Sequence, residues 1–590
     1  MREVDLLYTD SEHLYKKCDV MDNRVFDDLK LFRLIESCAN ARRHSYRYGS
    51  EMEEELRITY KALSSPCAVG RDITYRQQIF ASLLSKPGLA VAIASALSGS
   101  AALERTRQSY DHLDNAGKEC PYIRTLNYLF FLSGYKRFVL NLHDALAAVP
   151  REEGKGLHDF FAALEEERVF VESDAFNAPQ AEFKAFYSDK LRITGELTLR
   201  SSNFNELSFD FDESKITASY QTYDFIEALD SAERALGLAP EASAFSKKSE
   251  VTVIRPYHTF EKRLITKIFN DPEIIPEGRG RLTALTAEIK ALHDSIDPAP
   301  FALAYSQMRF YKNVCSMIEY LSARVANKFN FAERAESGRA LELRGIFDPV
   351  IALQKIQAAG DRSPADGPYI NDIQGNGLSV GDKRVFVITG PNNGGKTAFA
   401  RAAAICLIFH AAGAPIPADS GVIPTGLVPD THFTADETHK EGSGRLAHEL
   451  HRLEELYQTA NERRFLILNE TFAGTNPQRA LELFYEHSAR IAAIPAYALY
   501  VTHFHNIAIA VEEGQARGES AFAPCENLIA QMDAGGTRTF RVLPMRPSDT
   551  SFAADVVRRF KLSWEQMEEG LGLGRAAPLR GNGELKMDNG

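Results

Sequence analysis

The chain has 590 residues, of which 44% are hydrophobic, 25% charged and 10% aromatic, so it is long enough for two to four domains with ordinary globular cores. A formal net charge of -12 argues against a protein that coats nucleic acid non-specifically, although a local basic surface is compatible with this value. The seven cysteines are scattered without a CxxC pair, which predicts reduced core thiols in a cytoplasmic protein rather than a disulfide framework or a zinc site.

The first part of the chain, residues 1–335, is predicted to be a mainly α-helical core or lever domain. Its start, MREVDLLYTD, lacks the apolar core of a secretory signal. The small-apolar run that begins at Gly88 is short and interrupted by Gly and Ser, which predicts a buried helix rather than a membrane span. Apolar residues recur at helical spacing in 135–149 and 310–321, as expected for helices that pack in a scaffold.

A change of pattern marks a small β-rich insert and then a second domain. Residues 191–221 alternate and are rich in β-branched and aromatic residues, so we expect two to four strands there. Over 336–570 three apolar strands, RVFVIT, RFLIL and YALYVT, alternate with helical segments, which predicts a parallel sheet covered on both faces in an α/β domain. The Gly-rich, polar segment 571–590 is predicted to be a disordered tail.

The stretch GPNNGGKT matches the P-loop pattern GxxxxGK[ST], and it follows a predicted buried strand and opens a predicted helix. Its cofactor-binding residues are Gly390, Pro391, Asn392, Asn393, Gly394, Gly395, Lys396 and Thr397. The glycines let backbone N–H groups approach phosphates at the positive end of the helix. Lys396 would neutralise phosphate charge, and the Thr397 hydroxyl would ligate Mg²⁺. The stretch therefore predicts a nucleotide site in a P-loop NTPase domain.

Three further segments carry candidate site residues. Glu470, at the end of RFLILNE, is predicted to be the general base for the attacking water. Asn469 stands where hydrolases usually carry an Asp that holds Mg²⁺, and its uncharged amide predicts slow or Mg²⁺-demanding hydrolysis rather than a dead site. His503 follows the strand YALYVT and is predicted to sense a γ-phosphate. Ser443 lies just before a predicted helix, where small polar residues form either an anion site or an ordinary cap.

Taken together, these motifs resemble the MutS family of DNA mismatch-repair ATPases. VITGPNNGGKTAFAR is similar to that family's TGPN-x-GGKS/T loop, and LILNETFAGTNP and VTHFHNI follow it in the family's order. The similarity extends loosely over residues 20–570 and strongly only over 380–510. It implies an ABC-type ATPase domain, ATP and Mg²⁺ as cofactors, and a homodimer with two composite sites. In each site, Lys396, Thr397, Glu470 and His503 of one subunit would face Ser443 of the other.

The resemblance also carries expectations about the base and about DNA. Tyr369, in YIND, takes the place of family residues that contact adenine, and its ring is expected to stack on the base. Because the chain begins close to the family's core domain, we expect no mismatch-probing N-terminal domain. The insert at 191–221 is also shorter than the family's DNA clamp. The expected function is therefore that of an ATP-driven switch on a DNA structure, such as a damaged duplex, in repair or recombination.

Several alternatives stay open at this point. Basic segments with Arg42, Arg43 and Arg47, and with Arg279 and Arg281, would line a DNA channel or form ordinary solvated surface. An RNA- or ribosome-associated ATPase on the same scaffold is a second reading. A protein-interaction switch that uses ATP without nucleic acid is a third. In all three we expect a cytoplasmic protein without a membrane partner.

Overall fold

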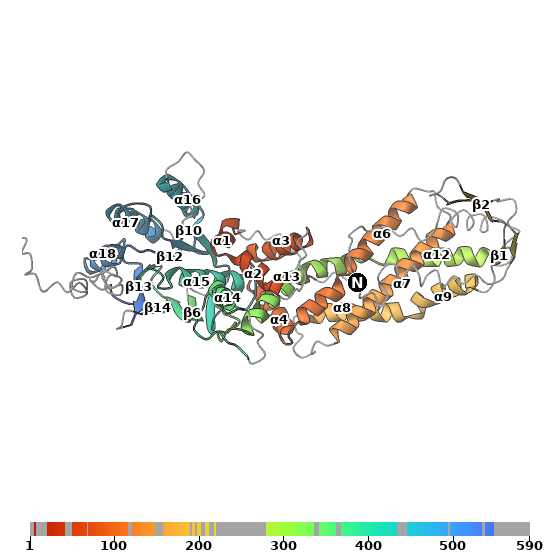
Figure 1. The fold of residues 1–590 in the computed structure, drawn as a ribbon, viewed down its shortest axis with the longest axis horizontal. Helices are drawn as coiled ribbons and strands as arrows, with labels where there is room; N and C mark the ends of the chain where they lie inside the picture. The colour runs from red at the N-terminus through yellow and green to blue at the C-terminus, as the bar shows by residue number, and fades with distance from the viewer. Residues whose placement is uncertain are drawn as a thin grey trace, which may run out of the picture. The chain divides into compact units, whose positions relative to one another are not determined.

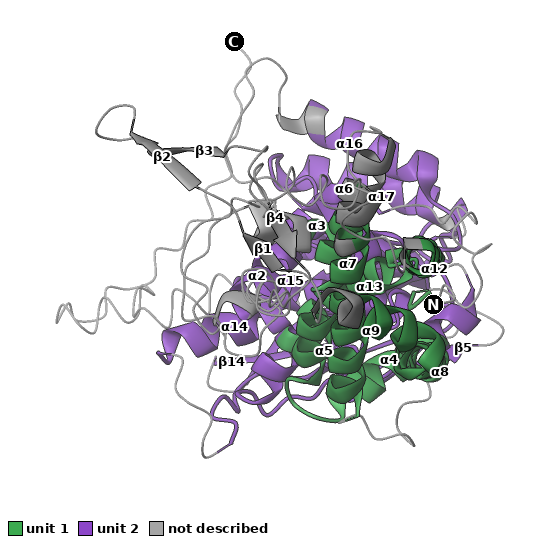
Figure 2. Ribbon diagram, turned by 90° about the vertical axis from the view of Figure 1, so that its right-hand side faces the viewer, with its two compact units in different colours: residues 1–14, 53–59, 75–316 green, residues 15–52, 60–74, 317–590 purple. Residues whose placement is uncertain are grey.

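The computed structural model divides into two compact units, shown in different colours in Figure 2. Unit 1 comprises residues 1–14, 53–59 and 75–316, and unit 2 comprises 15–52, 60–74 and 317–590. The structure describes residues 5–7, 21–41, 50–67, 69–115, 121–147, 157–188, 192–194, 197–201, 207–211, 217–219, 279–335, 341–360, 367–433, 445–493, 496–533 and 537–547. Two N-terminal segments thus cluster with the C-terminal part of the chain, whereas the domain boundaries expected at 335 and 570 remain predictions.

Unit 1 is mainly helical in its described part, as the sequence predicted (Figure 1). Its own helices are α5 (Leu89–Leu97), α6 (Ser100–Asn115), α7 (Pro121–Leu146), α8 (His158–Glu172), α9 (Asp174–Ser188) and α12 (Arg279–Ser295), while α3 (Ser50–Ser64), α4 (Gly70–Leu84) and α13 (Ala299–Ser322) have residues in both units. Helices α7 and α13 contain most of the two apolar stripes recognised in the sequence. Residues of α5, including Leu89, Ile93 and Leu97, are buried, so the small-apolar run is indeed a buried helix.

Four short strands lie within the predicted β-rich insert. They pair as two antiparallel ribbons, β1 (Arg192–Thr194) with β4 (Thr217–Ser219) and β2 (Leu197–Ser201) with β3 (Leu207–Phe211). The expectation of strands in this interval is therefore confirmed.

Among the described residues, no single helix is long and apolar enough to span a membrane. Helix α4 together with Leu89–Gln108 has the required length and composition, but the pair is bent by 102° at the break between them.

The described part of unit 2 is an α/β structure with two sheets. Its helices are α1 (Asn23–Asp28), α2 (Leu31–Ala41), α14 (Pro349–Ala358), α15 (Lys396–Ala411), α16 (Arg445–Thr459), α17 (Pro477–Ala493) and α18 (His505–Ala516). Its strands are β5 (Glu333–Ala335), β6 (Leu341–Ile346), β7 (Asn376–Val380), β8 (Val385–Thr389), β9 (Ser420–Pro424), β10 (Val428–Phe433), β11 (Arg464–Asn469), β12 (Tyr497–Val501), β13 (Cys525–Met532) and β14 (Arg538–Pro544).

The larger sheet has the strand order β10-β11-β12-β8-β13-β14. Every pairing in it is parallel except that of β13 with β14, which is antiparallel. The smaller, mixed sheet has the order β5-β9-β6-β7. The three apolar strands expected from the sequence are β8, β11 and β12, and they are direct neighbours with β12 between the other two. Since parallel strands end at the same edge, the segments that follow them meet there.

The core of the large sheet explains why these strands read as continuous apolar runs. Val385, Val387, Leu466 and Leu468 pack in one cluster with residues of α17 and α18. Alternate residues such as Ile388 point to the opposite face, where α15 contacts strands of both sheets. Both faces of the sheet are therefore covered, as predicted, and the strand ends are fixed on a rigid scaffold.

Helix α15 is buried along almost its whole length, and its last turn carries a buried histidine, His410, which is only 1% exposed. Neither ring nitrogen of His410 has a hydrogen-bond partner among the described residues. Burial, reinforced by the charge of Arg334, lowers the pKa of His410 to about 4. The folded protein thus holds this imidazole neutral at a pH where the unfolded chain protonates it.

We expect His410 to make the protein less stable in mild acid. Because the pKa of His410 is depressed in the folded state, its contribution to stability is fully present above about pH 6.5 and is lost as pH falls toward 4. Between pH 7 and pH 5 the loss is about 2 kcal/mol in the free energy of unfolding. In urea titrations at pH 7 and pH 5, the free energy of unfolding of His410→Leu should fall by about 2 kcal/mol less than that of the wild type. An equal loss in both proteins would contradict this role.

Candidate functional site

The P-loop after β8 is a tight turn whose backbone demands glycine at fixed places. Gly390 has φ +136°, and a Cβ there would lie 2.8 Å from both the Cβ and the carbonyl oxygen of Ala530 in β13. Gly395, the N-cap of α15, has φ +93°, and Asn393 has φ +57°. These left-handed positions curl the chain around the start of α15. The loop therefore presents backbone N–H groups and the positive end of a helix to one volume, which suits an anion.

Lys396 lies inside this loop and is 4% exposed. Its Nζ donates to the carbonyl oxygens of Gly390 and Pro391, at 2.9 and 3.0 Å. Burial lowers the pKa of Lys396, the charge of Glu470 opposes that shift, and Arg538 reinforces it. A buried ammonium that donates to neutral carbonyl oxygens would be stabilised by the negative charge of a phosphate ligand.

Thr397 and Asn469 meet although they are 72 residues apart in the chain. The Thr397 hydroxyl donates to the Asn469 amide oxygen at 3.0 Å, and Asn469 is 8% exposed at the end of β11. No group of three or more His, Cys, Asp or Glu side chains is arranged as a metal site within the described residues. The hydroxyl and amide oxygens nevertheless suit Mg²⁺, which prefers oxygen ligands and is usually held by few protein groups together with substrate phosphates.

Glu470 and His503 lie next to this pair at the same edge of the sheet. Glu470 follows β11 with φ +55°, and its N–H donates to the Val501 carbonyl of β12 at 2.8 Å. His503, just after β12, places Nδ1 3.7 Å from Glu470 Oε2. Both side chains are about one-third exposed, at 36% and 35%. The order β11-β12-β8 thus brings the candidate base and the candidate phosphate sensor to the P-loop.

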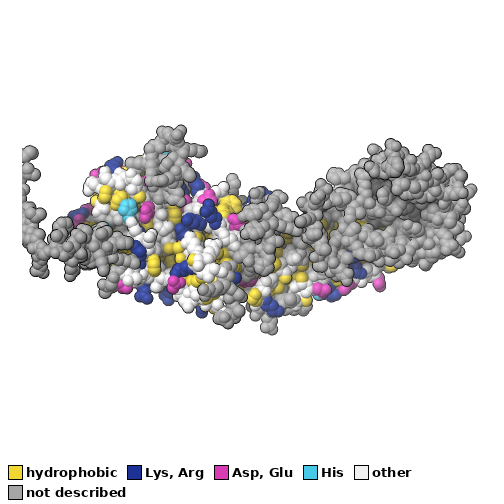
Figure 3. All heavy atoms as spheres, viewed as in Figure 1, with side chains coloured by type: hydrophobic (Ala, Val, Ile, Leu, Met, Phe, Trp, Pro, Cys, Tyr) yellow, Lys and Arg dark blue, Asp and Glu magenta, His cyan; other side chains and the backbone are white. Residues whose placement is uncertain are grey.

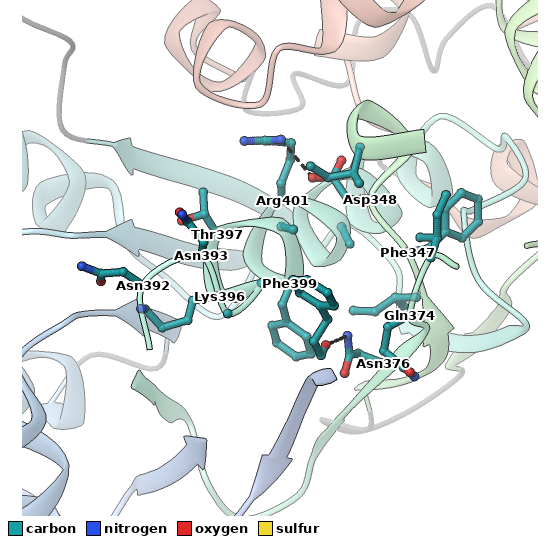
Figure 4. A pocket seen from close by; sticks show the side chains of 18 of the residues that line it. Phe347, Asp348, Gln374, Asn376, Asn392, Asn393, Lys396, Thr397, Phe399 and Arg401 are labelled. Carbon is teal, nitrogen blue, oxygen red and sulfur yellow. Dashed lines mark hydrogen bonds and ion pairs between the residues drawn. The ribbon is translucent and has the colours of Figure 1, made fainter. Parts of the chain in front are cut away.

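A pocket of about 780 Å³ joins these residues, and Figure 4 shows it at close range. Site residues predicted from the sequence that line it are Asn392, Asn393, Gly394, Gly395, Lys396, Thr397, Glu470 and His503. Gly390, Pro391 and Asn469 are not in its lining, although each contacts a residue that is. A cavity of this size matches a nucleotide-sized ligand.

The far side of the pocket is made by residues that the sequence reasoning did not find. Arg401 points toward Asp348, the N-cap of α14, in a buried ion pair of 2.9 Å (Figure 4). Burial raises the pKa of Asp348, and Arg401 opposes that shift. Lys355 and Asp372 form a second ion pair in the lining. Arg401 is the last residue of VITGPNNGGKTAFAR and Asp372 the last of YIND, but neither motif indicates these ion pairs, because the partners Asp348 and Lys355 come from α14 and its N-cap.

Phe540 of β14 also lines the pocket and is 46% exposed. Its backbone is left-handed, with φ +59°, close to an irregularity in the β13–β14 pairing. Asn376 holds it there, because its Nδ2 donates to the Phe540 carbonyl at 3.0 Å and its Oδ1 accepts from Val542 N–H at 2.8 Å. The structure thus places an exposed aromatic ring at a pocket that has the size of a nucleotide.

Other predicted residues lie elsewhere. Tyr369 is not in the pocket lining, and its N–H donates to the Arg324 carbonyl. Ser443 lies outside the described residues, as do Arg42, Arg43 and Arg47. Arg281 pairs with Glu182 and Glu288 on the surface of unit 1, while the side chain of Arg279 is not described. All five described cysteines are buried, as expected for core thiols.

Comparison with known proteins finds similarity in the region that carries this site. The family model for MutS domain V matches residues 386–527, a range that begins in β8 and ends in β13. The chain is 32% identical over 190 residues to the DNA mismatch repair protein MutS of Symbiobacterium thermophilum, which covers 31% of this chain and 20% of that protein. It is 22% identical over 325 residues to the DNA mismatch repair protein MutS of Thermotoga neapolitana, which covers 51% of this chain and 39% of that protein.

A eukaryotic relative matches over a shorter stretch. MutS protein homolog 4 of Mus musculus is 25% identical over 171 residues, which is 29% of this chain and 16% of that protein. The chain thus spans well under half the length of each of these curated relatives. The resemblance suspected from the motifs is confirmed.

Proposed function

Because this chain is a MutS-family protein, we propose that it is an ATP-hydrolysing switch that acts as a homodimer on a DNA structure. The observation that carries the proposal is the meeting of Thr397 with Asn469 beside Glu470 and His503, all at the P-loop end of one pocket. The four side chains come from the start of α15 and from the ends of β11 and β12, and three of them line the pocket, an arrangement suited to phosphoryl transfer to water.

Each of the described site residues has a separate role in the proposed hydrolysis. The P-loop N–H groups and Lys396 bind the β- and γ-phosphates, and Glu470 orients the attacking water and accepts its proton. His503, beside Glu470, contacts the γ-phosphate. Thr397, with Asn469 behind it, would hold Mg²⁺, which neutralises phosphate charge when bound. Phe540, whose Cδ1 would lie 3.5 Å from a Cβ at Gly395, offers a ring for the base beside the P-loop, a role that the family resemblance assigns to Tyr369.

In this proposal Asn469 makes hydrolysis slow or Mg²⁺-demanding, and the substitution Asn469→Asp tests this role. A carboxylate at this position would add charge behind the Thr397 hydroxyl, so we expect Mg²⁺ to act at about 10- to 100-fold lower concentration, with faster hydrolysis. Steady-state ATPase rates across a Mg²⁺ titration give both quantities. Asn527→Asp, on strand β13 of the same sheet and outside the pocket lining, is the control for an added buried charge. A lower rate together with a higher Mg²⁺ requirement in Asn469→Asp would refute the assignment.

The DNA part of the proposal is supported by the family relationship. Two relatives are named for DNA mismatch repair, and a DNA structure is the corresponding partner for this chain. On the face of the described residues visible in Figure 3, Lys and Arg side chains lie among Asp and Glu side chains. A binding site on such a surface consists of individual phosphate contacts rather than one uniformly basic face. A cytoplasmic location and pairing through the ATPase domain belong to the same proposal.

Binding assays on a panel of nucleic acids test this part. The panel contains intact, nicked, mismatched and branched DNA together with structured RNA, each measured with and without ATP at 50 and 200 mM salt. We expect affinity for at least one DNA structure that falls steeply with salt and changes with ATP. Preference for structured RNA would instead indicate an RNA-associated ATPase. ATP-dependent dimerisation without binding to any member of the panel would indicate a protein-interaction switch.

A further inference from the structure

The turn that carries Glu470 is held in an unusual backbone conformation. Both Glu470 and Phe472 have positive φ, +55° and +67°, in residues with full side chains. Left-handed conformations of such residues persist only where the surrounding structure imposes them. The position of the Glu470 carboxylate therefore depends on whatever fixes residues 470–472.

Buried polar groups from three other elements hold this turn. Tyr500 of β12 donates its hydroxyl to the Thr471 carbonyl at 2.9 Å. His432 of β10 lies with Nδ1 3.1 Å from the Thr471 hydroxyl oxygen. Glu449 of α16 accepts the Phe472 N–H through Oε2 at 3.2 Å, and this carboxylate is only 6% exposed. The first two groups belong to neighbouring strands of the same sheet, whereas Glu449 comes from a helix.

Helix α16 also packs against the turn through side chains. The Phe472 ring is fully buried and lies 5.0 Å from the His487 ring, between centroids. His487 in turn makes a 2.9 Å hydrogen bond with the Tyr457 hydroxyl of α16. The helix thus touches the turn directly through Glu449 and indirectly through Tyr457. A displacement of α16 would reach the backbone on which Glu470 stands.

We propose that Glu449 is a positioning residue for hydrolysis, which fixes the 470–472 turn and makes its geometry depend on the position of helix α16. This inference rests on the proposed ATPase function and adds a means of regulation to it. Helix α16 begins two residues after Ser443, the residue expected to contact the nucleotide of a partner subunit. A partner's nucleotide that shifts α16 would therefore alter hydrolysis in the subunit to which that helix belongs.

Two substitutions at Glu449 separate positioning from bulk packing. Glu449→Ala removes the acceptor of the Phe472 N–H, and we expect kcat to fall by about 10- to 100-fold, since small misplacements at an active site have effects of this size. KM for ATP should stay within about twofold, because Glu449 does not line the pocket. Glu449→Gln retains an acceptor oxygen and should keep kcat within about threefold of the wild type.

Asn527→Ala is the matched control for loss of a buried side-chain contact. Asn527 is also 6% exposed, and its Nδ2 donates to a backbone carbonyl, that of Ala508, at 2.9 Å. We expect this variant to lose stability as Glu449→Ala does, while its kcat stays close to the wild-type value. A kcat that falls equally in Glu449→Ala and Asn527→Ala would overturn the inference.

Hydrogen–deuterium exchange at the Phe472 amide gives a second readout that needs no ATPase activity. Exchange should accelerate in Glu449→Ala and remain slow in Glu449→Gln and Asn527→Ala. A Phe472 amide that stays protected in Glu449→Ala would overturn the inference, as would a loss of protection in Glu449→Gln equal to that in Glu449→Ala. If the wild-type protein does not hydrolyse ATP, the proposed function fails, and the exchange measurement still decides whether Glu449 holds the turn.

Discussion

Glu470→Gln is expected to lower the kcat for ATP hydrolysis by about 10²- to 10⁴-fold, the range that general-base catalysis contributes. Gln keeps the size of the side chain, so the left-handed backbone at residue 470 and its 2.8 Å hydrogen bond to Val501 should survive. It loses the carboxylate that accepts the proton of water. His503, 3.7 Å away, would then lack its acidic neighbour.

Nucleotide binding should be retained in this variant, because Glu470 lies beside the P-loop without supplying its backbone. In the proposed dimer, ATP would then hold the subunits together. Rapid-quench assays measure hydrolysis, titration with a fluorescent nucleotide measures binding, and sedimentation with ATP measures dimerisation. Glu482→Gln is the matched control, since Glu482 is exposed on α17 and pairs with Arg479 outside the pocket. Unchanged hydrolysis in Glu470→Gln would remove Glu470 from the catalytic assignment.

Lys396→Ala is expected to weaken nucleotide binding itself. Hydrogen bonds to a charged group contribute about 1.5–3 kcal/mol, which corresponds to roughly a 10- to 150-fold increase in Kd for ATP. The side chain is buried at the loop and has its charge next to Glu470. Its loss should also reduce the difference in affinity between ATP and AMP, because AMP lacks the β- and γ-phosphates.

Lys383→Ala controls for the loss of a lysine in the same region. Lys383 precedes β8, and its Nζ donates to the Ala523 carbonyl at 2.6 Å, so it too bonds a backbone carbonyl, but it does not line the pocket. Calorimetric titration with ATP and AMP should give wild-type Kd values for this variant. Equal affinities of Lys396→Ala and the wild type for ATP would mean that the pocket does not bind phosphates at the P-loop.

The pattern of residues was enough to identify the elements that depend on short-range physics. Gly390 and Gly395 mark a turn that other residues cannot adopt, so the P-loop was visible from its letters alone. The strands β8, β11 and β12 are apolar throughout because both faces are covered, and such runs are recognisable without knowing their neighbours. The β-rich insert was visible for a related reason, since alternation reports a two-sided strand.

The rest of the pocket could not be read in this way. Phe540 reaches it, beside Gly395, because an irregular β13–β14 pairing and the amide of Asn376 fix an unusual backbone angle. Arg401 and Asp348 are 53 residues apart, and their pairing depends on where the fold places the start of α14 relative to α15. Neither arrangement follows a spacing along the chain, because each is set by contacts between separate elements.

The sequence by itself determined the chemistry of the phosphate end, since Lys396, Thr397, Glu470 and His503 stand in motifs whose local geometry is nearly fixed by residue type. Only the tertiary structure decided that β12 lies between β8 and β11, which brings these motifs together at one edge of the sheet. It also decided that Glu449 of α16 holds the Glu470 turn. Both depend on long-range packing, in which a buried polar group must find its partner wherever the fold provides one.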